Sequence, residues 1–305
     1  MSFPPIQNCR FLTGPTGAGK TGIGVELAQK SDAEIISMDS MALYRGMDIG
    51  TAKPTAIERA AVPHHLLDVI EPDEQYSVAQ YIAAAHEKVE EIRRRGRSVL
   101  FVGGTPLYLK GLLRGLFKGP PADPAFRNAL EADAAEHGPD WLHARLAQVD
   151  PPSAERLHPN DTRRIIRALE VYEKTGEPMS DWQQQFNKLP EETGNRVYVL
   201  DWPRHELNDR IDRRVDAMFA AGLVEEVRGL MARDRSLSKT AGQAVGYREV
   251  IEHLEGVRNL DETIALVKQH TRQLAKRQGT WFRSLPESRY VAMGGLLASG
   301  IDQLQ

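Results

Sequence analysis

GPTGAGKT, residues 14–21, is the stretch that decides the fold of this 305-residue chain. It matches the pattern G-x-x-x-x-G-K-[ST], a loop whose backbone N–H groups surround a chain of phosphates. The apolar run Cys9–Thr13 before it predicts a strand, and a helical segment follows it. We call these eight residues the glycine loop: Gly14, Pro15, Thr16, Gly17, Ala18, Gly19, Lys20 and Thr21.

Two side chains of the glycine loop carry its predicted chemistry. Lys20 is expected to reach the outer phosphates, and Thr21 is expected to offer its hydroxyl to a bound Mg²⁺. The glycines let the backbone curl, so that its amides converge on an anion at the N-terminus of the next helix. Taken alone, the loop predicts a nucleotide site with ATP as the default ligand.

Strands and helices alternate through the first third of the chain. Apolar runs at Glu34–Asp39 and Ser98–Gly104 predict strands, and Ser77–Arg95 has the spacing of a helix. This order is typical of a P-loop NTPase-like α/β core with a parallel sheet. We predict that residues 1–120 and 197–305 form this core, with a mainly helical C-terminal part, and that residues 121–196 are a helical insertion domain.

Composition narrows the class of protein. The formal charge of −3 means that any nucleic-acid site must be a local patch. Cys9 is the only cysteine, so internal disulfides and a cysteine-built zinc site are excluded. No apolar run approaches the roughly 20 residues of a membrane span, and the first residues lack the pattern of a signal peptide. We therefore expect a cytoplasmic protein without a membrane partner.

Asp39 is the first candidate for catalysis, because it ends a predicted strand at the edge where the glycine loop opens. Its carboxylate could bind Mg²⁺ through water, act as a general base, or cap a helix. The run Val99–Thr105 ends in two glycines and a threonine, where nucleoside triphosphatases commonly place a Mg²⁺-binding carboxylate. This absence favours phosphate binding without hydrolysis.

Two basic stripes lie on predicted helices. One carries Arg163 and Arg167 within Asp161–Gly176, and the other lies in Thr263–Pro286, which contains no acidic residue. The second stripe is made of Lys268, Arg272 and Lys276. Such stripes are usually solvated helix faces, but two of them beside a phosphate loop favour RNA.

Together these motifs resemble the tRNA dimethylallyltransferase family. The resemblance implies transfer of a dimethylallyl group from dimethylallyl diphosphate to the exocyclic amine of the adenosine on the 3′ side of the anticodon, with Mg²⁺ as cofactor. It also implies a monomer whose insertion domain binds the anticodon stem-loop of tRNA. The matching stretches are GPTGAGKT, IISMDSMALYRGMDIGTAKP (35–54), PHHLLDV (63–69), FVGGTPLYLKGLL (101–113), RRIIRALEVYEKTG (163–176), AVGYREVI (244–251) and QLAKRQGTWFR (273–283).

The resemblance also implies roles for single residues. Asp39 matches the general base, Thr105 a residue near the acceptor, and Arg228 an arginine near the pyrophosphate, while Lys20 and the rest of the glycine loop match the diphosphate site. Two positions depart from the family pattern, since Ala42 replaces a glutamine and Pro106 a glycine. The positions that match tRNA-binding residues are Asp39, Ser40, Met41, Ala42, Thr105, Arg163, Arg164, Ile165, Ile166, Arg167, Gln243, Arg248, Lys276, Arg277 and Arg283.

Three other functions stay open at this point. An isopentenyltransferase acting on free adenine nucleotides would not need the long helical insertion. A small-molecule kinase would be expected to have the missing strand-end carboxylate. A non-catalytic RNA-binding module would have no use for the glycine loop and Asp39.

Overall fold

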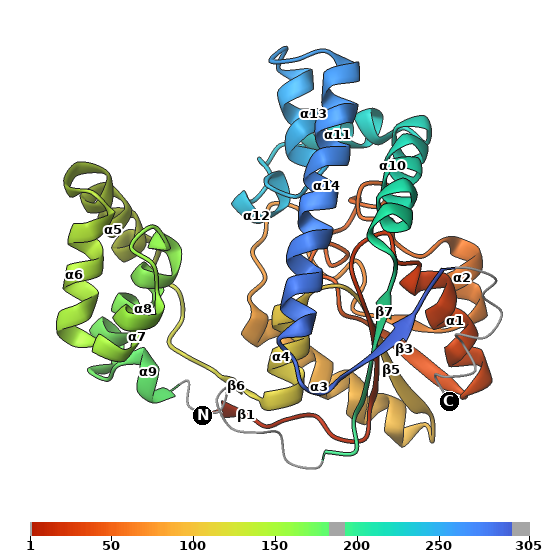
Figure 1. Cartoon of the computed structure of the whole chain (residues 1–305), viewed down its shortest axis with the longest axis horizontal. Helices are drawn as coiled ribbons and strands as arrows, with labels where there is room; N and C mark the ends of the chain where they lie inside the picture. Colours follow the sequence, from red (N-terminus) through yellow and green to blue (C-terminus); the bar gives the residue numbers. More distant parts are fainter. Residues whose placement is uncertain (1, 183–192, 295–305) are drawn as a thin grey trace. The chain divides into compact units, whose positions relative to one another are not determined.

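The computed structural model describes residues 2–182 and 193–294 (Figure 1). The chain divides into two compact units, which we call the α/β unit (residues 6–113 and 192–305) and the helical unit (residues 1–5 and 114–191). The helical unit thus starts earlier than the insertion predicted at residues 121–196, and it takes in the first five residues.

A six-stranded sheet forms the centre of the α/β unit, and every pairing in it is parallel. The predicted α/β fold class is confirmed. The strand β8 was not predicted, because most of its side chains are exposed and it lacks an apolar run. In spatial order the strands are β4 (His64–His65), β3 (Ala33–Ser37), β5 (Ser98–Val102), β2 (Arg10–Thr13), β7 (Arg196–Asp201) and β8 (Ser288–Ala292).

Helices connect these strands and make up most of the described last third of the chain (Figure 1). The helix α3 shows why they form: Ser77 and Gln80 make a capping box at its start, and Tyr81, Ile82 and Val89 bury one face. The helices are α1 (Lys20–Lys30), α2 (Ala56–Ala61), α3 (Val78–Arg94), α4 (Pro106–Arg114), α10 (Arg204–Ala220), α11 (Leu223–Met231), α12 (Lys239–Gly242), α13 (Tyr247–Leu254) and α14 (Leu260–Arg283). None of the helices in the described part of the chain is long and apolar enough to span a membrane.

The helical unit has its own core. Leu130, Leu142 and Leu146 pack with residues of α8 in one buried cluster. Glu170 of α8 is fully buried, and its carboxylate accepts a bidentate pair of hydrogen bonds from Arg127 at 2.9 and 2.7 Å. The elements of this unit are β1 (Ser2–Phe3), β6 (Leu116–Phe117), α5 (Pro124–His137), α6 (Pro139–Val149), α7 (Pro151–Arg156), α8 (Thr162–Thr175) and α9 (Met179–Trp182).

The ends of β3 and β5 touch through their backbones. The amide of Met38 donates to the carbonyl of Val102 at 2.8 Å, and the amide of Thr105 donates to the carbonyl of Met38 at 3.2 Å. A Cβ atom at Gly103 would lie only 2.1 Å from the Met38 carbonyl oxygen. Gly103 is therefore required by close approach of two chain segments.

We expect Gly103→Ala to lower the free energy of unfolding by about 3 kcal/mol or more, because its methyl group would meet backbone that cannot move aside. The matched control is Gly229→Ala, inside α11, where a Cβ would meet no atom within 4 Å. That variant should stabilise the protein by about 0.5–1 kcal/mol. Urea denaturation measures both, and equal stability of the two variants would contradict the packing argument.

Candidate active site

Three loops at the carboxyl edge of the sheet form the candidate site. The glycine loop follows β2, Asp39 follows β3 and Gly103 follows β5. Because β3 pairs with β5 and β5 with β2, all in parallel, these three strand ends lie next to one another. All three loops contribute to the lining of one cavity, with Lys20 and Thr21 on the glycine-loop side.

The glycine loop has the conformation of an anion site. Gly14, Gly17 and Gly19 have φ angles of 144°, 83° and 86°, which side chains with a Cβ rarely adopt. Gly19 is also the N-cap of α1 and has no side chain to bond the first amides of that helix. These amides and the positive end of the helix are therefore available to an anion in the cavity.

Lys20 is held inside the glycine loop. Its ammonium group donates to the carbonyl oxygens of Gly14 at 3.0 Å and Pro15 at 2.9 Å. Burial lowers the pKa of Lys20 to about 8; the positive charge of Arg214 adds to this effect and the charge of Asp39 opposes it. Below pH 8 the loop thus carries a desolvated positive charge without a carboxylate in contact.

The arginine that lines this cavity is Arg214 of α10. Burial lowers its pKa, and the negative charge of Asp39 opposes this effect. Arg228, which the resemblance implied near the pyrophosphate, instead lies exposed on α11, where it pairs with Glu225 at 3.3 Å. The assignment of Arg228 to the site is therefore corrected to Arg214, which the sequence places one helical turn after Arg210.

Asp39 and Thr105 lie on two turns that are bonded to each other. The Asp39 carboxylate accepts the amide of Met41 at 2.9 Å, which orients it at the cavity. The Thr105 hydroxyl accepts the amide of Ser40 at 3.0 Å. Asp39 and the buried Ala42 line the cavity, whereas Thr105 is not among the lining residues and holds the 39–41 turn in place.

Gln278 of α14 bridges two of these loops. Its Oε1 atom accepts the amide of Thr16 at 2.9 Å, and its Nε2 atom donates to the carbonyl of Gly104 at 2.7 Å. The spacing of Ile264 and Val267 places Gln278 on the inward face of the helix. Its bridging contacts had no sequence signal, because they join segments about 170 and 260 residues apart.

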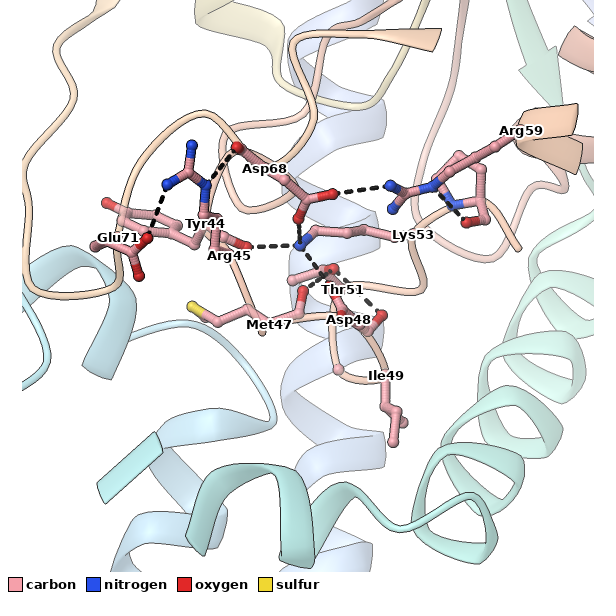
Figure 2. A network of polar contacts seen from close by, with 12 residues as sticks. Tyr44, Arg45, Met47, Asp48, Ile49, Thr51, Lys53, Arg59, Asp68 and Glu71 are labelled. Carbon is pink, nitrogen blue, oxygen red and sulfur yellow. Dashed lines mark hydrogen bonds and ion pairs between the residues drawn. The ribbon is translucent and has the colours of Figure 1, made fainter. Parts of the chain in front are cut away.

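A second side of the cavity is formed by the segment that follows Tyr44. Figure 2 shows the Lys53 ammonium surrounded by three oxygen atoms, from the Tyr44 carbonyl (2.6 Å), Asp48 (2.6 Å) and Asp68 (2.5 Å). Burial raises the pKa of Asp68, but hydrogen bonds from Lys53 and Arg59 outweigh burial and hold it below the usual value. The lysine side chain is only 2% exposed, so this network fixes the cavity wall.

A carboxylate of α11 anchors the same wall. Glu226 accepts the amides of Asp48, Ile49 and Gly50 at 3.0, 2.7 and 3.3 Å. It also accepts the hydroxyl of Tyr247 from α13 at 2.6 Å. The wall segment and the two helices are thereby joined at one acidic group.

The cavity has a polar and an apolar part. The apolar side chains of Ile35, Leu67 and Val102 line it together with the glycine loop, Lys20 and Arg214. No group of three His, Cys, Asp or Glu side chains that could hold a metal occurs in the described residues. A magnesium ion bound with phosphates needs only one or two carboxylates, so Thr21 and Asp39 in one lining fit this ion.

The predicted RNA-binding residues that lie on or next to the helices α12, α13 and α14 are exposed. Gln243 follows α12, Arg248 lies on α13, and Lys276, Arg277 and Arg283 lie on α14. Arg248 is partly engaged, because it donates to Glu249 at 2.6 Å.

Much of the basic stripe on α14 is paired within the protein. Lys268 contacts Asp216 at 2.6 Å and Arg272 contacts Asp212 at 2.5 Å. Both acids belong to α10, which lies beside α14 (Figure 1). Lys268 and Arg272 thus join α14 to α10. Lys276 is the one member of the three-residue stripe that falls in the predicted RNA-binding segment.

The predicted RNA-binding residues of α8 divide into two groups. Ile165 and Ile166 are buried in the core of the helical unit, so the prediction that they contact RNA is wrong. Arg167 bonds the buried Glu170 and the Pro120 carbonyl, which also makes it structural. One face of the helix points to the core and the other to solvent. Of the predicted RNA-binding residues of α8, Arg163 and Arg164 are the exposed ones.

Comparison with known proteins agrees with this geometry. The family model for IPP transferases matches residues 42–285. The tRNA dimethylallyltransferase of Rhodopirellula baltica is 49% identical over 294 residues, which cover 94% of this chain and 88% of that protein. The tRNA dimethylallyltransferase 1 of Trichlorobacter lovleyi is 46% identical over 281 residues, covering 92% of each chain.

Solved structures give the same result. The tRNA isopentenylpyrophosphate transferase of Bacillus halodurans is similar with a TM-score of 0.71 and 38% identity, covering 98% of this chain and 94% of that one. A eukaryotic dimethylallyltransferase acting on tRNA is similar with a TM-score of 0.83 and 29% identity, covering 97% and 77%. Since the family model spans most of the chain and its relatives are nearly half identical to it, this chain belongs to the tRNA dimethylallyltransferase (IPP transferase) family.

Proposed function

We propose that this protein transfers the dimethylallyl group of dimethylallyl diphosphate to the exocyclic amine of the adenosine beside the tRNA anticodon, releasing diphosphate. The observation that carries the proposal is a single cavity lined by the glycine loop, the cations Lys20 and Arg214, the Asp39 carboxylate and several apolar side chains. A substrate with a diphosphate head and a short hydrocarbon tail matches this division.

The cationic side of the cavity suits the leaving group. An allylic C–O bond breaks readily when the departing diphosphate is stabilised by charges and amides that are already in place. Lys20, Arg214 and the first amides of α1 provide such groups. Bound Mg²⁺, for which Thr21 is the proposed partner, would neutralise further charge on the diphosphate.

Asp39 is the proposed general base. As the allylic carbon leaves the diphosphate oxygen, it bonds to the adenine nitrogen, and that nitrogen must lose a proton. The Asp39 carboxylate, oriented by the Met41 amide, would take this proton. Thr105 would act indirectly, by holding the turn that carries Asp39.

The exposed cations are proposed to bind the RNA phosphates. In the α/β unit these cations are Lys276, Arg277 and Arg283 of α14. In the helical unit they are Arg163 and Arg164, which we propose bind the anticodon stem. The described part of a single chain supplies every proposed catalytic group, so we propose that the protein acts as a monomer.

Purified protein with dimethylallyl diphosphate, Mg²⁺ and unmodified tRNA should attach one dimethylallyl group, detected by mass spectrometry of the digested RNA. Asp39→Asn should lower the transfer rate by about 100-fold or more, since a positioned base is worth that much. Its affinity for tRNA should stay within about twofold. Near-normal turnover would remove Asp39 from its role, and labelling of free AMP instead of tRNA would favour a free-nucleotide enzyme.

The two arginines form a matched pair for a second test. Arg214→Ala should lower kcat/KM by about 100-fold, because it removes a buried charge beside the proposed leaving group. Arg228→Ala should change kcat/KM by less than about twofold, since Arg228 is exposed and pairs only at the surface. The reverse order of effects would restore Arg228 to the site.

Binding of magnesium pyrophosphate should weaken as the pH rises above 8. In the free protein Lys20 is protonated below its pKa of about 8 and neutral above it. Only the charged form attracts the anion, so affinity should fall by up to about tenfold per pH unit above that value. The control is Lys20→Met, which is neutral at position 20 at every pH. Its affinity reports the change that comes from titration of the pyrophosphate alone. Wild-type affinity should converge on that of the variant; a constant gap from pH 7 to 10 would contradict the role of Lys20.

A further inference from the structure

Both polar atoms of the Gln278 side-chain amide make hydrogen bonds within the candidate site. The oxygen holds the Thr16 amide of the glycine loop, and the nitrogen holds the Gly104 carbonyl after β5. Each bond has good length for its type. One side chain of α14 thus joins the proposed diphosphate site to the loop that leads to Thr105.

Gly104 shows how close these groups lie. A Cβ atom there would be 2.9 Å from the Gln278 Nε2 atom and 3.3 Å from the Lys20 ammonium. Lys20 itself donates to the Gly14 and Pro15 carbonyls, immediately before the Thr16 amide that Gln278 holds. Lys20 and Gln278 therefore hold adjoining residues of the glycine loop, Lys20 at Gly14 and Pro15 and Gln278 at Thr16.

The helix that carries Gln278 also carries the exposed cations of the predicted RNA surface. Lys276 and Arg277 directly precede Gln278, and Arg283 follows it by little more than one turn. A helix of 24 residues moves as a stiff body over such a short distance. A displacement of the helix backbone at these cations therefore moves the Gln278 amide as well.

We propose that Gln278 is a positioning residue that couples RNA binding on α14 to the conformation of the glycine loop. RNA phosphates on Lys276, Arg277 and Arg283 hold the helix in the position in which Gln278 bonds both Thr16 and Gly104. The glycine loop is then set to receive the diphosphate. This inference rests on the proposed function, because it requires both an RNA and a diphosphate ligand.

The test compares the affinity for magnesium pyrophosphate with and without a synthetic anticodon stem-loop RNA, measured by calorimetry. Wild-type protein should bind pyrophosphate about tenfold more tightly when the RNA is present, within the usual range of coupling between sites. The reciprocal titration should give the same factor. Gln278→Met, which keeps the length of the side chain but removes both hydrogen bonds, should reduce the factor to about one.

The matched control is Gln269→Met on the exposed face of the same helix, which should keep the wild-type factor. Thermal melting checks that each variant folds, and Gln278→Asn, whose amide is one methylene too short to reach both partners, replaces Gln278→Met if that variant does not. If Gln278 had a purely structural role, its replacement would weaken the binding of both ligands and leave the coupling factor between them unchanged.

An unchanged factor in a folded Gln278 variant, or a factor of one in the wild type, would overturn the inference. Transfer of the dimethylallyl group to tRNA by the same wild-type preparation separates this result from failure of the proposed function. If transfer occurs without coupling, only the role of Gln278 is lost.

Discussion

The parallel pairing of β2, β5 and β3 is the constraint on which the rest of the site depends. It brings the glycine loop, the Gly103–Thr105 turn and Asp39 to one edge, although Gly14 and Thr105 lie 91 residues apart in the sequence. The backbones approach so closely at Gly103 and Met38 that no side chain fits between them. Asp39, Gly103 and the glycine loop are thus positioned by the sheet itself, whereas Arg214 lines the cavity from α10.

Charge is distributed unevenly around this edge. Lys20 and Arg214 are buried near each other, and their mutual repulsion and desolvation are unfavourable for the protein alone. These two cations lower the free energy of unfolding of the protein alone, and binding of an anion between them would raise it again. Such a local loss of stability is typical of functional sites. The acidic side chains of Asp48, Asp68 and Glu226 instead surround the wall segment that follows Tyr44, where they bind Lys53 or backbone amides.

The sequence predicted what depends on local pattern. The helix predicted after the glycine loop is observed as α1, and Asp39 was placed at the correct sheet edge because strand ends can be read from apolar runs. Arg214 and Gln278 were missed as site residues, since they reach the cavity through packing of α10 and α14 from far along the chain. Ile165 and Ile166 were misassigned because a motif match covers consecutive residues, whereas a helix exposes only some of them.

The clamp at Glu226 has a consequence for ligand selectivity. The amides of residues 48–50 form a cluster of the kind that captures phosphates, next to residues 51–54 of the cavity that we propose binds the diphosphate. Their own carboxylate already fills that cluster, and Tyr247 holds the carboxylate in place. A diphosphate in the cavity would therefore find the amides of residues 48–50 already occupied and the first amides of α1 open, so one orientation would be favoured before any chemistry begins.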